Sequence, residues 1–148
     1  VEPNLITFNA IIDCFAKNGD PKGAGVWYAR MLERGIRPDV ISYATVITAA
    51  AKIGDAVQAV AWLQQMLSNG LKPNLICYNS VIDAYAKAGD VQAASYWFEE
   101  SCRAGHLPDE VTYTSMVDAC SKQGDAAGAA MWLEKMDAAG LPPNAFTY

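Results

Sequence analysis

The sequence predicts an all-α fold, a solenoid of stacked helix-turn-helix repeats. A period of 35 residues runs through the chain without insertion, and it places the tryptophans at Trp27, Trp62, Trp97 and Trp132. Gly-Asp pairs recur with the same period, at Gly19-Asp20, Gly54-Asp55, Gly89-Asp90 and Gly124-Asp125. A fixed period of this length is typical of repeat proteins in which each unit buries its apolar face only against its neighbours.

Turns that contain proline separate the repeats. A Pro-Asn or Pro-Asp pair closes each one, at Pro3-Asn4, Pro38-Asp39, Pro73-Asn74, Pro108-Asp109 and Pro143-Asn144. We therefore expect residues 1–4 to end a preceding repeat, residues 5–39, 40–74, 75–109 and 110–144 to form four repeats, and residues 145–148 to begin a fifth. The chain starts in one turn and stops inside the next helix, as a segment of a longer array would.

Each repeat is predicted to contain two helices. In the first repeat, one helix is expected over residues 5–17 and ends at Gly19, which tolerates the left-handed conformation of a C-terminal cap. The second helix begins after Asp20, whose side chain caps it, and ends near Arg34. The same cap is repeated at Asp55, Asp90 and Asp125.

The second helix of each repeat has one apolar side. In the first repeat this side holds Ala24, Trp27, Tyr28 and Met31. The same register carries Ala59, Trp62, Leu63 and Met66, then Ala94, Trp97, Phe98 and Ser101, then Ala129, Trp132, Leu133 and Met136. Ser101 replaces a methionine, so the third repeat should pack less well. A row of tryptophans can also be a platform for stacked bases, but these share their stripe with Leu and Met, which favours a core.

The first helix of each repeat has two different sides. Its apolar side in the first repeat holds Phe8, Ile11, Ile12 and Phe15. The opposite stripe holds Ile6, Asn9, Asp13 and Lys17, at steps of three, four and four. Stacking of the repeats would present this stripe once per repeat along one side of a solenoid.

Composition excludes several classes of function. The content of 52% hydrophobic and 18% charged residues is that of a folded chain. No apolar run approaches the roughly 20 residues of a membrane span, so no membrane partner is expected. A net charge of −5 argues against indiscriminate phosphate binding, which needs a basic field. A local groove can nevertheless be basic on an acidic protein.

The sequence contains no recognisable catalytic or metal-binding pattern. Cysteines occur at unrelated places in the repeats and are interpreted as reduced thiols acting as small apolar residues: Cys14, Cys77, Cys102 and Cys120. His106 has no equivalent in the other repeats and is expected to be solvent-exposed. No nucleophile–base pair, phosphate loop or deaminase signature is present, so we expect no cofactor, no metal site and no enzymatic activity in this segment.

The segment PNLICYNSVIDAYAKAGD (73–90) resembles the first-helix half of a pentatricopeptide repeat. Ala93-Ala94, Trp97-Phe98 and the turn GHLPD (105–109) resemble the second half, and the resemblance covers nearly the whole chain. The uniform repeat length is similar to the pure type of the family. A tetratricopeptide array has a 34-residue period with Leu-Gly after its Trp, which this sequence lacks. The resemblance implies a right-handed superhelix.

Members of this family bind single-stranded RNA, one base per repeat, with two or three side chains reading each base. The resemblance assigns base recognition to paired positions: Asn9 with Asp39, Ala44 with Asn74, Asn79 with Asp109, and Thr114 with Asn144. It assigns the apolar sandwich around each base to Ile6, Ile41, Ile76, Val111 and Phe146. The family's preferences, and its orientation with the N-terminus towards the RNA 5′ end, imply the target 5′-U-N-U-A-3′.

Two of these assignments have structural alternatives. The last residue of each turn can simply cap the following helix. A lysine at the end of each first helix is assigned to phosphate contacts by the resemblance: Lys17, Lys52, Lys87 and Lys122. Three of these lysines follow an aspartate by four residues, so they can instead form ordinary ion pairs along the helix.

The resulting hypothesis is sequence-selective binding of single-stranded RNA, in organellar RNA processing, stabilisation or translation. The alternative is a protein-interaction scaffold that binds an extended peptide in the same groove, for which basic clamps or apolar pockets would be more natural. The family resemblance implies a mitochondrial or chloroplast location, with a targeting peptide upstream of Val1. Protein partners would bind outside this segment.

Overall fold

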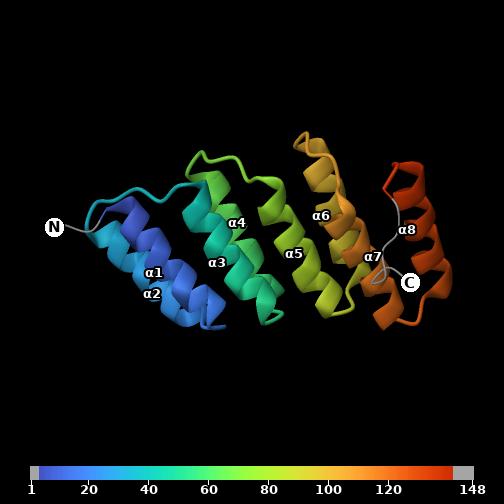
Figure 1. Cartoon of the computed structure of the whole chain (residues 1–148), viewed down its shortest axis with the longest axis horizontal. Coiled ribbons are helices and arrows are strands. Elements are labelled where there is room, and N and C mark those ends of the chain that lie inside the picture. The colour runs from blue at the N-terminus through green and yellow to red at the C-terminus, as the bar shows by residue number, and fades with distance from the viewer. Residues whose placement is uncertain (1–3, 142–148) are drawn as a thin grey trace. The chain divides into compact units, whose positions relative to one another are not determined.

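The computed structural model describes residues 4–141. It forms two compact units that divide between residues 77 and 78, inside one helix. The described residues contain no strand and form eight helices of 13 residues each (Figure 1). The helices are α1 (Leu5–Lys17), α2 (Pro21–Glu33), α3 (Val40–Lys52), α4 (Ala56–Ser68), α5 (Leu75–Lys87), α6 (Val91–Arg103), α7 (Glu110–Lys122) and α8 (Ala126–Ala138). The prediction of an all-α fold built from helix pairs is confirmed.

Short-range signals in the sequence set the helix limits. The Asp20 carboxylate accepts a hydrogen bond from the Gly23 N–H at 2.9 Å, and Pro21 occupies the first position of α2, where no N–H is needed. Gly19 adopts a φ of +71°, the left-handed conformation that lets the chain turn sharply between α1 and α2. The predicted caps of the other second helices are observed as well, at Asp55, Asp90 and Asp125.

In the first unit, α1 contacts α2 and α3, α2 contacts α3, and α3 contacts α4. Two buried tyrosines of its core belong to a hydrogen-bonded cluster that extends to the surface. The hydroxyls of Tyr28 and Tyr43 lie 2.7 Å apart, Gln65 donates to the first at 2.9 Å, and Asn69 donates to the second at 2.6 Å. Burial and the bond to Tyr43 raise the pKa of Tyr28, so this cluster stays uncharged at neutral pH.

In the second unit, α7 contacts both α6 and α8. Its core brings together Ile82, Ala94, Tyr113, Met116, Cys120, Trp132 and Met136. Ser101, expected to weaken the packing, is fully buried, and its hydroxyl donates to the Phe98 carbonyl at 2.7 Å. The expectation of an exposed His106 is wrong, because its half-buried ring lies 5.5 Å from the ring of Tyr78.

The tryptophan row lies at the edge of the core in three of its four positions. Trp132 is buried, whereas Trp27, Trp62 and Trp97 are half-buried. The residue that follows the tryptophan is buried in two repeats, as Tyr28 and Leu63, and it fills the interior there. The rings still pack against protein, as in the edge contact of Trp62 with Tyr28 at 4.7 Å. The prediction of a packing role is therefore right in full only for Trp132.

Truncation of Trp132 tests this packing role. Trp132→Ala should lower the free energy of unfolding by about 3–5 kcal/mol, because the cavity left in the second unit cannot fully collapse. Met131 is exposed on the same helix, so Met131→Ala should change stability by no more than about 0.5 kcal/mol. Urea unfolding followed by circular dichroism measures both. Equal, small effects would show that the tryptophan does not hold the core.

Candidate functional site

The first helix of every repeat exposes a large aliphatic side chain at its second position. In α7, where the first residue is Glu110, this side chain is Val111. The exposed fractions are 77% for Ile6, 62% for Ile41, 60% for Ile76 and 57% for Val111. Single exposed aliphatic residues are common on proteins, but here one is exposed at the same register in all four first helices. The fifth member predicted for this row, Phe146, lies outside the described residues.

In the first repeat, the predicted base-edge residues are hydrogen-bonded to each other. Asn9 Nδ2 donates to Asp39 Oδ1 at 3.2 Å, so α1 and the turn before α3 meet at this pair. Asp39 also caps α3, because the same oxygen accepts the Ser42 N–H at 3.0 Å. The Ser42 hydroxyl lies 2.5 Å from Asn9 Oδ1. The Asp39 carboxylate therefore both caps α3 and pairs with Asn9, so the two interpretations of this residue are compatible.

The third repeat repeats this arrangement in the second unit. Asn79 Nδ2 donates to Asp109 Oδ1 at 3.1 Å, and the Thr112 hydroxyl lies 2.6 Å from Asn79 Oδ1. Asp109 accepts the Thr112 N–H at 3.1 Å and caps α7. The same hydrogen-bond geometry therefore forms in both repeats that carry an asparagine in the first helix and an aspartate at the end of the turn.

The second repeat has a different geometry. Ala44 offers only a methyl group, and Asn74 Oδ1 caps α5 by accepting the Cys77 N–H at 3.1 Å. Both residues line a groove of 280 Å³ that also contains Ile41 and Ile76 and the two lysines that end α1 and α3, Lys17 and Lys52. The predicted sandwich, base-edge and phosphate residues of this repeat thus share one cavity.

The fourth repeat is described only in part. Its predicted partner residue, Asn144, lies outside the described residues. Thr114 Oγ1 is buried and has no hydrogen-bond partner within residues 4–141. A buried hydroxyl without a partner is costly, because it has lost its hydrogen bonds to water.

Electrostatics keep the Asp39 carboxylate charged. Burial alone would raise its pKa, but hydrogen bonds from the Ser42 N–H, the Asn9 amide, the Ser42 hydroxyl and its own N–H more than offset that effect. The pKa of Asp39 is therefore lower than usual, and the side chain is a hydrogen-bond acceptor throughout the neutral range.

The lysine row is mostly engaged in ion pairs. Lys17 Nζ lies 2.8 Å from Asp13, and the equivalent distances are 3.0 Å for Lys87 with Asp83 and 3.3 Å for Lys122 with Asp118. The hydrogen bond to Asp13 and the negative charge of that aspartate raise the pKa of Lys17. Lys52 differs because Thr48 stands where the other helices have aspartate, and it forms no ion pair within the described residues.

Sequence reasoning missed the hydroxyls of Ser42 and Thr112. Both residues are fully buried at the third position of their helices and complete a reciprocal cap with Asp39 or Asp109. The signal was partial: Asp at a helix start is a common cap, but the reciprocal cap usually has Glu or Gln three residues later, where this chain has Ser or Thr. Their reach back to Asn9 and Asn79 has no local signal.

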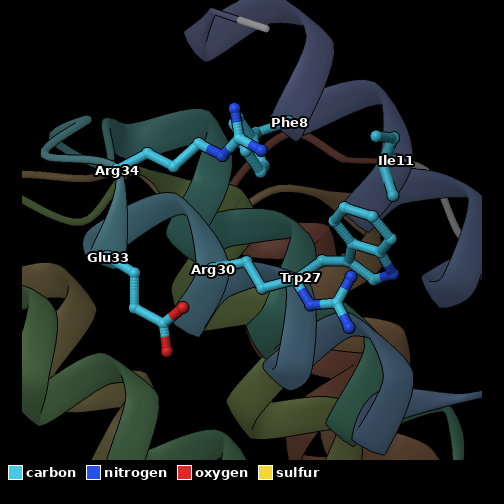
Figure 2. Close-up of a pocket in the computed structure, with 6 residues that line it drawn as sticks. All are labelled: Phe8, Ile11, Trp27, Arg30, Glu33 and Arg34. Carbon is cyan, nitrogen blue, oxygen red and sulfur yellow. The ribbon is translucent and has the colours of Figure 1, made fainter.

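A larger cavity of 450 Å³ lies on the other side of α1 and contains none of the predicted site residues. Figure 2 shows the cavity with the Arg30 side chain beside the Trp27 ring, and the guanidinium carbon lies 4.6 Å from the ring centre. Its lining comes from the apolar side of α1 and from α2: Phe8, Ile11, Trp27, Arg30, Glu33 and Arg34.

Within residues 4–141, no group of three His, Cys, Asp or Glu side chains is placed to hold a metal ion. No helix in this range has the length and hydropathy to span a bilayer. All four cysteines are free, and Cys14 and Cys102 are exposed, so the interpretation as apolar residues fits only Cys77 and Cys120. Burial raises the thiol pKa of both buried cysteines.

Comparison with known proteins identifies the family. A sequence model of the PPR repeat family matches residues 3–52, 73–122 and 108–148, and one of the pentatricopeptide repeat domain matches residues 28–88. The chain belongs to the pentatricopeptide repeat family. No curated protein sequence matches it.

Solved structures agree with this assignment. The pentatricopeptide repeat protein PPR10 from maize is 30% identical, with a TM-score of 0.85 over 99% of this chain and 21% of PPR10. PPR10 in complex with an 18-nt psaJ RNA element gives a TM-score of 0.88 at 30% identity, over 99% of this chain and 22% of that one. The chain thus spans about a fifth of the length of PPR10.

A more distant structure shows the same fold. The PPR domain of Arabidopsis thaliana protein-only RNase P 1, solved in complex with tRNA, is 15% identical, with a TM-score of 0.82 over 99% of this chain and 78% of that one. The fold is therefore the α-solenoid of helix-turn-helix repeats that the sequence predicts.

Proposed function

We propose that this chain binds single-stranded RNA sequence-selectively, one base per repeat, through the exposed stripe of its first helices. The observation that carries the proposal is the repeated combination of an exposed aliphatic side chain with a hydrogen-bonded Asn–Asp pair. An aliphatic side chain offers dispersion contact to the flat face of any base. The polar pair offers donors and acceptors to its edge.

The Asn–Asp pairs favour uracil. In the first repeat the Asn9 amide group donates one of its two hydrogens to Asp39, and its oxygen accepts from the Ser42 hydroxyl. The second amide hydrogen therefore remains available as a donor to a base. The ionised Asp39 remains an acceptor. Uracil presents carbonyl acceptors on both sides of a ring N–H donor, which complements this pair. The same reasoning assigns uracil to Asn79 with Asp109.

The other two repeats are assigned more coarsely. Ala44 has no hydrogen-bonding side chain, so the second repeat should discriminate poorly among bases. Thr114 with Asn144 is assigned to adenine by family preference. With the N-terminus towards the RNA 5′ end, the four repeats read 5′-U-N-U-A-3′. The sandwich around these bases comprises Ile6, Ile41, Ile76, Val111 and Phe146.

Phosphate contacts are assigned to Lys17, Lys52, Lys87 and Lys122. Each ion-paired lysine keeps donors that an RNA phosphate can accept, although the pairing aspartate opposes the phosphate. Lys52 forms no ion pair within residues 4–141, because the groove's Asp13 pairs with Lys17, and it lines the groove with Ile41 and Ile76. The likeness to PPR10 in complex with RNA supports this binding mode. Family membership extends the proposal to organellar RNA processing, stabilisation or translation, in a mitochondrion or chloroplast.

A selection from random single-stranded RNA tests the base assignment. The enriched sequences should share uracil at the first and third positions, adenine at the fourth, and no preference at the second. Each correct polar contact should contribute about 1–3 kcal/mol, as base-edge contacts elsewhere do. A shared motif without uracil at the first and third positions would contradict the assignment.

Salt titrations test the phosphate contacts. Lys52→Ala should weaken binding to all RNA sequences about equally and lower the slope of log K against log salt by about 0.7. Lys87→Ala should have a smaller effect, because Asp83 already neutralises part of that charge. Lys22→Ala removes the same charge from α2, outside the stripe, and serves as the control. A changed base preference in Lys52→Ala, or equal slopes for Lys52→Ala and Lys22→Ala, would contradict the contact.

A further inference from the structure

We infer that the buried hydroxyl at the third position of a repeat's first helix, Ser42 or Thr112, is a specificity-determining residue for the base read by the preceding repeat. This inference rests on the proposed function and extends it, because it adds a third side chain, which does not touch the RNA, to each reading pair. The residue acts through the asparagine of the preceding repeat and is therefore a positioning residue.

The direction of the hydrogen bonds follows from the distances and from the number of hydrogens available. A hydroxyl carries one hydrogen. The Ser42 hydroxyl accepts the Asp39 N–H at 3.2 Å, and it lies closer to Asn9 Oδ1, at 2.5 Å, than to Asp39 Oδ1, at 3.0 Å. It therefore donates to the amide oxygen, which agrees with the amide nitrogen donating to Asp39. The Thr112 hydroxyl lies 2.6 Å from Asn79 Oδ1 and 2.8 Å from Asp109 Oδ1, so it likewise donates to the amide oxygen.

This bond fixes which group the asparagine presents. The hydroxyl of Ser42 or Thr112 donates to the asparagine oxygen, and the aspartate accepts one hydrogen of the asparagine amide. The asparagine side chain is therefore held at both its oxygen and its nitrogen, and its second amide hydrogen points to the base as a donor. Without the hydroxyl, the amide keeps one partner and can rotate until its oxygen is free to accept. A free acceptor suits the amino group of cytosine, which replaces a carbonyl of uracil. The hydroxyl therefore discriminates uracil from cytosine.

The second repeat lacks this arrangement, as the inference requires. Ala44 has no amide to orient, and the third position of the following helix carries Cys77 instead of Ser or Thr. Cys77 is buried and its N–H is capped by Asn74, so the position folds normally without the hydroxyl. The repeat that lacks the asparagine, with Ala44 in its place, is therefore followed by a helix that lacks the hydroxyl, with Cys77 in its place. This also shows that the fold tolerates a cysteine there.

Two reciprocal variants test the inference by base preference. The dissociation constants of the whole chain are measured for RNAs that carry U or C at the first or the third position. Thr112→Val should lower the preference for U over C at the third position about three- to tenfold, the value of one hydrogen bond, and leave the first position unchanged. Ser42→Ala should do the reverse.

The controls separate this role from a merely structural one. Thr112→Ser keeps the hydroxyl and should keep the preference. Thr112→Cys copies the residue found at position 77 and provides a folded variant without the hydroxyl if Thr112→Val is unstable. In Thr7→Val the lost hydroxyl is one that bonds, among the described residues, to the cap residue Asn4, so base preference should not change.

The outcomes are distinguishable. If the unmodified chain shows no preference for uracil at either position, the proposed function is wrong. If it prefers uracil and the variants without the hydroxyl keep that ratio, or weaken all RNAs equally, the inference alone is overturned.

Discussion

The hydrogen bond that starts each first helix is the interaction on which the rest of the structure depends. Asp39 and Asp109 end one repeat, cap the helix that begins the next, and hold the asparagine of the preceding repeat with the same oxygen. One carboxylate therefore fixes the helix start, the register between successive repeats and the polar pair of the candidate site. Because the cap sets where the helix begins, it also determines which residue is second in the helix, and that residue, Ile41 or Val111, is exposed to solvent.

Much of this organisation could be predicted because its determinants are local. Gly, Pro and Asp limit each helix, and the helical spacing separates Ile6 and Asn9 from the buried Phe8 and Ile12. What could not be predicted depends on partners distant in sequence. The Ser42 hydroxyl meets an amide 33 residues away, and nothing in the repeat pattern announces that contact. The half-buried His106 and the tryptophans at the edge of the core likewise depend on which neighbour fills the adjacent space.

The repeats differ in ways that bear on recognition. The first and third hold a hydrogen-bonded amide, whereas the second offers a methyl group and a groove lined by Lys52, which forms no ion pair in the described part of the chain. The chain carries a net charge of −5, and three of the four stripe lysines already face an aspartate. Under the proposed function, long-range attraction to RNA would therefore be weak, and affinity would have to come from short-range stacking, hydrogen bonds and the few available charges.

The central claim is that the exposed aliphatic residues of the first helices contact RNA, and one pair of variants tests it most directly. Ile76 and Val57 are both exposed and both occupy the second position of a helix, but Val57 lies on α4, outside the stripe. Either residue changed to Asp adds the same charge where a helix N-terminus tolerates it. Binding of a labelled single-stranded RNA containing 5′-U-A-U-A-3′ is measured by anisotropy, with thermal unfolding as a check. The account predicts that Ile76→Asp weakens binding at least about tenfold, roughly 1.4 kcal/mol, while Val57→Asp leaves it unchanged and both proteins remain stable. Equal RNA affinities for the two variants would contradict it.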